Sequence, residues 1–301
     1  MVRDLHKAYP RAFVTDVRTS CPALWENNPY ITPLSEKDVD VQVVACEYPL
    51  IHVSNSEPWH FLHGFMEDVS RKLGVNITPT EFGGDVHVSE LERSWVSQVQ
   101  EITGETTRFW IVNAGGKFDF TAKWWDPVKW QAVVDHFRGK VRFVQIGEAG
   151  HHHPALDGVI DLRGKTDLRQ LVRLVFHSDG ICCGVSLPMH LAAAVPSKWR
   201  PRRPCVVVAG GREPPHWESY PTHHFLHTIG FLPCCAEGGC WKSRVVPLGD
   251  GDEKDRHPNL CLLPVVREAR TPQPQCMELI TPRDVIEKIE LYLQVERYAL
   301  A

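Results

Sequence analysis

The spacing of apolar residues between residues 105 and 209 switches repeatedly between two patterns. Short β-branched and aromatic runs have the length of buried strands. They occupy residues 109–112, 141–146, 158–162, 180–186 and 205–209. Between them, apolar residues recur three and four positions apart, which is typical of helices with one buried face. These helical stretches are residues 127–137, 168–176 and 189–194. The alternation predicts an α/β domain with a parallel sheet.

The remainder of the chain is less regular. In the first hundred residues the predicted helices are 2–9, 58–73 and 88–99, and the predicted strands are 12–14 and 41–45. Residues 219–255 are predicted to be mostly loop, and a closing helix follows Thr281. We place a domain boundary near Gly104, which divides the chain into residues 1–104 and residues 105–301.

Residues that favour helix ends mark several of these helices. Asp126 and Pro127 suit the N-cap and the first helical position of the helix that follows them. Thr166 is the predicted cap of the helix at 168–176, and Thr281 that of the closing helix. Gly74 suits the left-handed position after a helix C-terminus.

Small and charged residues follow most of the predicted strands. Parallel sheets bind ligands at the carboxyl ends of their strands. After the first strand, Gly115 and Gly116 precede Lys117 and Lys123, and a helix N-terminus comes next. Together they suit an anion-binding loop, although an ordinary strand–helix turn with solvated lysines has the same pattern. Glu213 follows the last strand and is a further candidate for this cleft.

Composition limits the function classes. The 301 residues are 43% hydrophobic, enough for a sizeable core and two domains, and the formal net charge is −4. An acidic balance argues against a nucleic-acid binder held by phosphate contacts. The sequence shows neither a membrane span nor a signal peptide, so a cytoplasmic soluble protein is expected.

Five of the ten cysteines lie after residue 219. Cys235 and Cys240, with two glycines between them, and the later Cys261 and Cys276 offer four thiolates for a tetrahedral ion. Cys234 is an alternative to Cys235. The competing interpretation is a set of buried free thiols. Trp124 and Trp125 likewise suit either a ligand-facing position or the core.

Three segments resemble glycosyltransferase family 9, the ADP-heptose heptosyltransferases. They are VNAGGKFDFTAKWW (112–125), IDLRGKTDLRQL (160–171) and CCGVSLPMHLAAA (182–194). The resemblance covers the part after residue 107 and, less clearly, the part before it. It implies a GT-B fold of two Rossmann-like domains, with the acceptor side in 1–104 and the nucleotide-sugar site in 105–301. The cysteines further resemble those of the autotransporter heptosyltransferase branch, which implies a ferric ion on four cysteines and a homo-oligomer.

The resemblance also implies roles for individual residues. Lys123 matches a lysine that pairs with the donor diphosphate, and Thr121 would add a hydroxyl hydrogen bond. Glu148 matches a position that contacts the ribose. The other implied donor contacts are the amides of Gly184, Val185 and Ser186, and the side chains of Pro188 and Met189 beside adenine, followed by His190 of the same motif. The bound ion would be structural, Fe³⁺ or Zn²⁺.

Two departures from the family pattern bear on activity. Val185 and Leu187 stand where the family has an acidic residue and a glycine. The expected first strand and its loop, which carries the general base, do not precede the helix at 2–9, so the N-terminal domain is expected to be truncated. No catalytic residue is assigned, with Asp16 and Glu47 as weak candidates.

Three functions remain open from the sequence. The first is an inverting glycosyltransferase that moves a heptose or related sugar from an ADP-sugar to a hydroxyl of lipopolysaccharide core, a protein or a small molecule. The second is a non-catalytic relative that binds a nucleotide sugar. The third is a metal–sulfur protein with a redox-active four-cysteine site.

Overall fold

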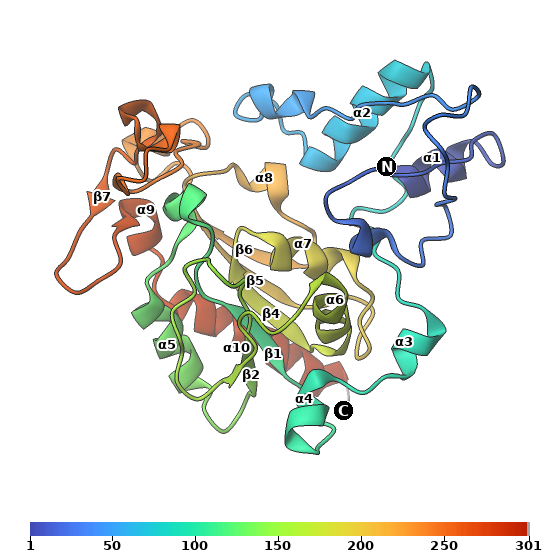
Figure 1. The fold of residues 1–301 in the computed structure, drawn as a ribbon. Coiled ribbons are helices and arrows are strands. Elements are labelled where there is room, and N and C mark those ends of the chain that lie inside the picture. Colours follow the sequence, from blue (N-terminus) through green and yellow to red (C-terminus); the bar gives the residue numbers. More distant parts are fainter. Residues whose placement is uncertain (300–301) are drawn as a thin grey trace.

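A six-stranded parallel sheet forms the centre of the protein, whose computed structural model describes residues 1–299, with side chains as far as residue 294 (Figure 1). Its spatial order is β3-β2-β1-β4-β5-β6. The strands are β1 Trp110–Asn113, β2 Phe143–Gln145, β3 Ile160–Asp161, β4 Gly180–Gly184, β5 Cys205–Gly210 and β6 His223–His227. All neighbouring pairs are parallel. The predicted α/β domain is therefore confirmed.

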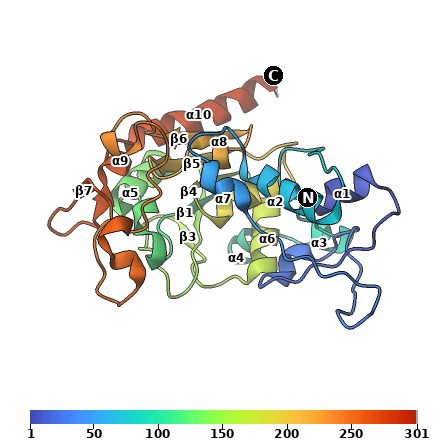
Figure 2. The same cartoon turned by 90° about the horizontal axis from the view of Figure 1, so that it is seen from above.

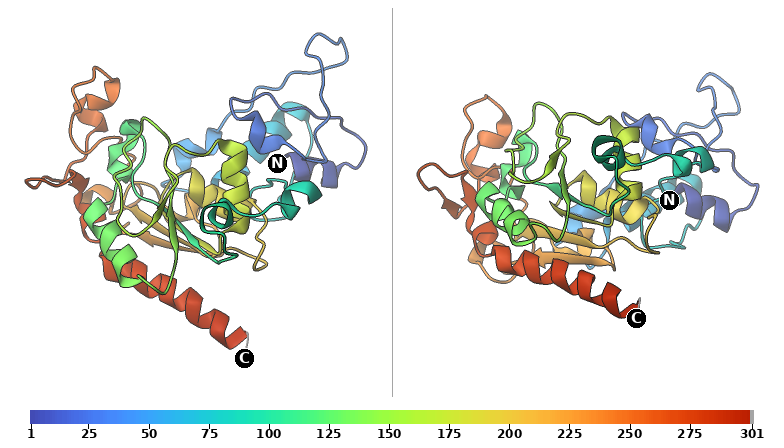
Figure 3. Two further views of the ribbon diagram at one scale, coloured as in Figure 1. Left: turned by 60° about the horizontal axis from the view of Figure 1, so that its bottom comes forward. Right: turned by 90° about the horizontal axis from the view of Figure 1, so that it is seen from below.

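Helices cover both faces of this sheet. α5 (Pro127–His136) and α10 (Pro282–Ala299) pack on one face, and α6 (Leu168–His177) and α7 (Leu187–Ala194) on the other. Figure 3 shows α10 as a long rod along its side of the sheet. Successive residues of β1 point to opposite faces: Trp110 joins the cluster beneath α5 and α10, whereas Ile111 joins the cluster beneath α6 and α7.

Most predicted helix ends are confirmed. The Asp126 side chain accepts a hydrogen bond from the Val128 amide at 2.9 Å, and Pro127 begins α5. Gly74 ends α2 (Phe61–Leu73) with φ of +67°. The predicted Thr166 cap is wrong, because the side chain of its neighbour Asp167 accepts from the Gln170 amide and completes a capping box.

The N-terminal third differs most from expectation. Its helices are α1 Val2–Ala8, η1 Pro22–Trp25, η2 Pro49–Val53, α2, α3 Glu90–Ser94 and α4 Gln98–Thr103. The strands predicted at 12–14 and 41–45 are wrong: Val14 and Val43 are 66% and 69% exposed, so neither run has a buried face to pair over. Within residues 1–104, all of which the structure describes, pairing is limited to a single bridge from Thr15 to Ile31. A second Rossmann-like domain is not seen there.

The helix predicted at 88–99 is two helices. Ser89 caps α3 by accepting from the Glu92 amide, and Ser97 caps α4 by accepting from the Gln100 amide. A serine side chain that accepts a hydrogen bond from a backbone amide at a helix N-terminus favours the start of a new helix over continuation of the preceding one. Trp95 between them has an extended backbone, with φ of −66° and ψ of 150°.

The loops and short elements between β6 and α10 lie beside the sheet, on the side away from α1 (Figure 2). β6 was not predicted, because its sequence HHFLH lacks the apolar run of a central strand and forms the edge of the sheet. The other elements of the C-terminal third are α8 Pro215–Glu218, η4 Pro233–Cys235, η5 Glu253–Asp255, η6 His257–Asn259, β7 Pro264–Val265, β8 Gln273–Pro274 and α9 Gln275–Glu278. None of the helices described through residue 299 is long and apolar enough to cross a bilayer.

Close packing between β1 and β4 gives a test of the fold. A Cβ at Gly180 would lie 2.4 Å from the Trp110 ring, which is fully buried opposite it. We expect Gly180→Ala to lower the free energy of unfolding by about 1–3 kcal/mol, as overpacking does. Gly64→Ala is the matched control: its Cβ would meet nothing closer than 3.6 Å, and alanine favours the interior of α2. Equal stability of the two variants in urea unfolding would contradict this packing.

Candidate functional site

A charged centre lies where β1, β4 and β5 end. β1 leads to η3 (Phe118–Lys123), β4 to α7, and β5 to the loop before α8. Because the three strands are parallel neighbours, their carboxyl ends meet at one edge of the sheet. Side chains from all three connections, Lys123, His190 and Glu213, interact there. The predicted convergence of strand-end loops is confirmed for these three.

Lys123 and Arg212 share one buried carboxylate. The Lys123 Nζ lies 2.7 Å from Glu213 Oε1, and the Glu213 side chain is only 3% exposed whereas that of Lys123 is 23% exposed. Arg212 Nη1 contacts the same oxygen. The Arg212 guanidinium lies between two rings, 4.9 Å from the centroid of Phe120 and 5.4 Å from that of Trp241. The sequence placed Glu213 near the cleft but gave no sign of this ion pair.

A second carboxyl group, that of Glu218, was missed by the sequence analysis. Burial, and then the negative charge of Glu213, raise its pKa to about 7. Its Oε2 is buried without a hydrogen-bond partner among the described residues. Tyr48 from the N-terminal third and Tyr220 both have a raised pKa, caused first by burial and then by the charge of Glu218. The sequence PPHWES (214–219) is mostly polar and has no apolar pattern that would predict burial of this glutamate.

His190 connects the centre to the N-terminal third. Its Nδ1 lies 3.0 Å from the Tyr220 hydroxyl, and its ring meets that of Phe61 on α2 edge to face at 5.3 Å between centroids. Burial, followed by the charge of Lys123, lowers the His190 pKa to about 4. The imidazole is therefore neutral at pH 7.

The start of α7 faces the same region. A Cβ at Gly184 would lie 3.3 Å from the Lys123 carbonyl oxygen, so the two loops approach closely. Ser186 occupies the N-cap but accepts no bond from the helix; instead its Oγ donates to the Gly184 carbonyl at 3.4 Å. Val185 is buried, and Leu187 is 40% exposed. The α7 N-terminus is thus free of a side-chain cap.

Gly115 and Gly116 contact another loop. The Gly116 amide donates to the His152 carbonyl at 2.9 Å, and the His152 amide donates back at 3.1 Å. Gly115 has φ of +124°, and a Cβ there would lie 1.9 Å from the His152 oxygen. The Trp124 ring stacks on His152 at 4.1 Å. The glycines are therefore required by this loop, and the Gly116 amide is already satisfied.

Several other predicted donor residues are buried in the core or already have other contacts. The Thr121 hydroxyl accepts from the Val245 amide at 2.9 Å and is buried. Glu148 has a 73% exposed side chain, 3.4 Å from His151. Pro188 and Met189 are buried, and Met189 belongs to the core cluster beneath α6 and α7. Trp124 and Trp125 are both buried, as expected of core residues.

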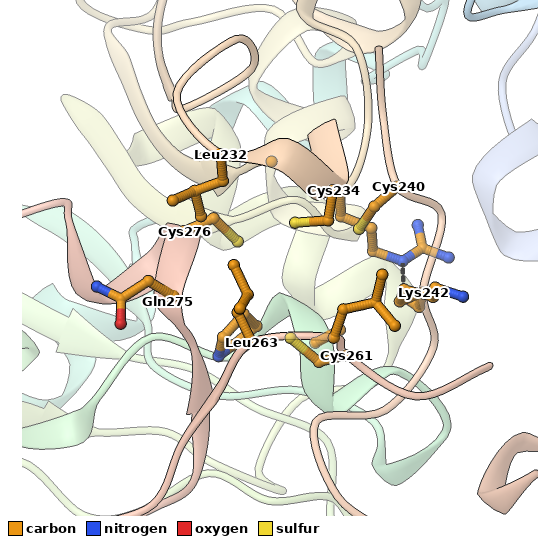
Figure 4. Close-up of a pocket in the computed structure, with 13 residues that line it drawn as sticks. Leu232, Cys234, Cys240, Lys242, Cys261, Leu263, Gln275 and Cys276 are labelled. Carbon is orange, nitrogen blue, oxygen red and sulfur yellow. Dashed lines mark hydrogen bonds between the residues drawn. The ribbon is translucent and has the colours of Figure 1, made fainter. Parts of the chain in front are cut away.

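Four cysteines line a cavity of about 10 Å³. They are Cys234, Cys240, Cys261 and Cys276, and Figure 4 shows the sulfur atoms of Cys234 and Cys276 pointing toward one another. Burial raises the pKa of all four thiols. Cys235, by contrast, donates through Sγ to the Thr228 carbonyl at 3.4 Å. Within residues 1–299, no group of three ligating side chains is arranged to hold a metal ion, so the four-cysteine metal loop is not confirmed.

Arg212 joins the cavity to the charged centre. Its side chain lines the cavity, and its Nε donates to the Lys242 carbonyl at 2.7 Å (Figure 4). A Cβ at Gly211 would lie 2.8 Å from Cys235 Sγ, so the backbone after β5 passes directly against the cysteines. A change in the cysteine loops would therefore act on Arg212 and, through it, on Glu213.

Comparison with known proteins gives structural matches only. No protein-family model matches the sequence, and no curated protein matches it. The chain is similar to the solved ADP-heptose lipopolysaccharide heptosyltransferase II of E. coli, with 18% identity, a TM-score of 0.46, and coverage of 73% of this chain and 56% of that one. It is similar to the dodecameric iron-containing heptosyltransferase TibC of enterotoxigenic E. coli H10407 in complex with ADP-D-β-D-heptose, with 20% identity, a TM-score of 0.47, and coverage of 77% and 54%.

A third match is a glycosyltransferase family 9 protein from Veillonella parvula DSM 2008, with 18% identity, a TM-score of 0.43, and coverage of 57% and 49%. These solved structures are of the family that the sequence motifs resemble. The chain spans about half the length of each of them.

Buried neutral histidines give a test by pH. Burial lowers the pKa of His60 to about 3 and that of His177 to about 4. The unfolded chain binds these protons near pH 6.5 and the folded chain does not, so the free energy of unfolding falls as pH drops below about 6.5, by up to about 1.4 kcal/mol per pH unit for each such group. Urea unfolding between about pH 7.5 and 5 measures the slope.

Variants of a buried and an exposed histidine test whether burial causes this pH dependence. We expect His60→Leu to reduce the slope, because it removes one buried proton acceptor, whereas His52→Leu, at an exposed position on η2, retains it. A wild-type unfolding free energy that is flat over this range would contradict the neutral burial of these rings.

Proposed function

We propose that the chain binds a nucleoside diphosphate sugar at the charged centre and transfers the sugar to a hydroxyl acceptor with inversion. The observation that carries this proposal is the position of Lys123 and Arg212 beside an uncapped helix N-terminus at the end of a parallel sheet. In keeping with the resemblance to glycosyltransferase family 9, the donor is an ADP-heptose or a related ADP-sugar. Residues 105–301 would bind it, and residues 1–104 would face the acceptor.

The electrostatics favour a diphosphate at Lys123. The Nζ is the partly exposed member of its ion pair, so an anion reaches it from solvent without crossing the core. The amide of Leu187, which begins α7 after Gly184, Val185 and Ser186, adds a hydrogen-bond donor at the positive end of a helix dipole. Pro188 has no N–H, and the Met189 amide already donates to the Ser186 carbonyl at 3.0 Å. These groups would also stabilise the charge that develops on the departing nucleotide diphosphate.

The remaining donor contacts belong to the same proposal. Glu148 would contact the ribose, since its carboxylate is exposed at the end of the β2 loop. Pro188, Met189 and His190 would lie beneath the base and phosphates, with Gly115 and Gly116 fixing the neighbouring loop. Thr121, whose hydroxyl holds Val245, would act by fixing η3.

A non-catalytic nucleotide-sugar binder is the second candidate, and the engagement of N-terminal carboxylates favours it. A transferase needs a group that removes the acceptor proton. Asp4 accepts from the Thr80 hydroxyl at 2.7 Å and its pKa is lowered to about 2. Asp16 accepts from the Leu34 amide at 2.9 Å and pairs with Arg18 at 2.5 Å. Neither carboxylate is free to accept a proton from an acceptor.

Calorimetric titration with ADP, UDP and GDP tests the donor site. We expect ADP to bind selectively and Lys123→Met to weaken it by roughly 10- to 100-fold, the value of a charge-assisted hydrogen bond of about 1.5–3 kcal/mol. Lys117→Met is the matched control, because Lys117 lies exposed on the same loop without a buried partner. Unchanged ADP affinity in a folded Lys123→Met protein would exclude Lys123 as a donor ligand.

We also propose a structural Fe³⁺ or Zn²⁺ at the cysteine cavity, with Cys234, Cys240, Cys261 and Cys276 as ligands. The number and type of side chains suit a tetrahedral thiolate site, and the cavity is about 10 Å³, close to the volume of one water molecule. The ion would fix the loops between η4 and α9. Cys234 replaces Cys235 in this proposal because Cys235 Sγ is turned to Thr228.

Metal analysis of the purified protein tests this site. We expect one equivalent of iron or zinc, lost in Cys234→Ser and retained in Cys235→Ser, with a lower melting temperature after chelation. Retention in Cys234→Ser with loss in Cys235→Ser would reverse the assignment. Visible colour that bleaches on reduction would identify iron and favour a redox role.

A further inference from the structure

The buried carboxyl group of Glu218 has no role in the donor site described above. It lies in the same buried centre as Glu213, Lys123 and Arg212, whose charges act on it. Glu213 already contacts both cations, through Lys123 Nζ at 2.7 Å and through Arg212 Nη1. Glu218 therefore has no cation of its own, and its Oε2 has no hydrogen-bond partner among the described residues.

A simple charge count shows what this arrangement can do. With Glu218 ionised, two carboxylates oppose two cations in a buried space; with Glu218 protonated, the centre has a net positive charge. A diphosphate bound at Lys123 brings at least two further negative charges. Buried like charges cannot all remain ionised, so the weakest acid of the group takes a proton.

The groups around Glu218 make it the member that titrates. The charge of Glu218 acts on Tyr48 and Tyr220, and burial raises the already high pKa of both phenols, so neither ionises near neutral pH. Burial lowers the pKa of His60, which also interacts with Glu218, to about 3. His190 belongs to the same centre, and its lowered pKa of about 4 keeps it neutral. The Glu218 pKa of about 7 lies between these values, and burial is its first cause.

We propose that Glu218 is a proton-accepting residue that couples binding of a nucleoside diphosphate at Lys123 to the uptake of one proton. This inference rests on the proposed nucleotide site. The step is a simple protonation: the Glu218 carboxylate takes one proton from solvent and becomes a neutral carboxylic acid, and no covalent bond of the nucleotide changes. The neutral acid then presents an O–H donor where a carboxylate would repel the phosphate.

The coupling has a definite sign. The nucleotide-bound protein holds the Glu218 proton more tightly than the free protein, so linkage makes the nucleotide bind less tightly as pH rises above about 7. The loss approaches tenfold in affinity per pH unit where one proton is taken up. Below about pH 6 the carboxyl is already neutral in the free protein, and the affinity no longer gains from this group.

Calorimetry with ADP at about pH 8 measures the uptake directly. The β-phosphate of ADP is ionised there, since phosphates of this kind have a second pKa of about 6. Titrations in two buffers with different enthalpies of ionisation give the number of protons exchanged. We expect uptake approaching one proton and an affinity that falls by at least about tenfold between about pH 7 and 9.

Two variants assign the proton. In Glu218→Gln we expect ADP to bind with no proton uptake and with an affinity that changes less than about twofold over the same range, because the amide does not titrate. Glu90→Gln, at a 98% exposed glutamate of α3, is the matched control and keeps the wild-type behaviour. Proton uptake that persists in Glu218→Gln overturns the proposal.

If Glu218→Gln does not fold, the number of protons taken up by the wild-type protein on ADP binding still decides the proposal. ADP binding without proton exchange at about pH 8 overturns the role of Glu218 and leaves the nucleotide site standing. Absence of ADP binding at about pH 6, where Glu218 is neutral, in a folded sample overturns the proposed function itself. The two failures are therefore distinguishable.

Discussion

Parallel pairing of β1 with β4 and of β4 with β5 is the constraint on which the rest of the structure depends. It brings the ends of three strands to one edge, and each strand is followed by a connection that carries a polar side chain into the same space. The ion pair of Lys123 with Glu213 joins residues 90 positions apart in the chain, and it forms because β1 and β5 flank β4. The charged centre is thus a consequence of strand order.

Burial of that centre explains its pKa pattern. The same exclusion of water that lowers the His190 pKa raises that of Glu218, because both shifts disfavour the charged form. The Glu213 carboxylate contacts both cations of the centre, Lys123 and Arg212, so a ligand anion must compete with Glu213 for them.

Sequence patterns predicted the parts of the structure whose cause is local. Five strands of the sheet and the Asp126 cap follow from short-range apolar spacing and from side chains that satisfy nearby amides. β6 was missed because its residues are half-polar and become a strand only by pairing with β5. The strands predicted at 12–14 and 41–45 are absent from the described structure for the opposite reason: the residues there are apolar, but no neighbouring strand pairs with them.

The candidate site shows the same division. Lys123 and the cavity cysteines were found because residue type and spacing are visible in one segment. Glu218 was not, because its pKa is set first by burial, which only the folded chain produces; Tyr48, on which its charge acts, is 170 positions earlier in the chain. Gly115 and Gly116 illustrate a third case: the sequence placed them in an anion-binding loop, whereas the group that approaches the Gly115 backbone is the carbonyl of His152.

The N-terminal third is held to the sheet by polar contacts and by Val88 and Val99, which join the core cluster beneath α6 and α7, in place of strand pairing. Glu92 of α3 pairs with Arg169 of α6, with Oε2 2.6 Å from Nη2, and Arg169 also donates to the His87 carbonyl at 2.6 Å. Asn55 accepts from the Gly239 amide at 2.9 Å and so fixes η2 against the cysteine loops. Phe61 on α2 contacts His190 of the charged centre, so these contacts also position the N-terminal third beside that centre. The surroundings of the charged centre therefore depend on contacts far from Lys123 in the sequence.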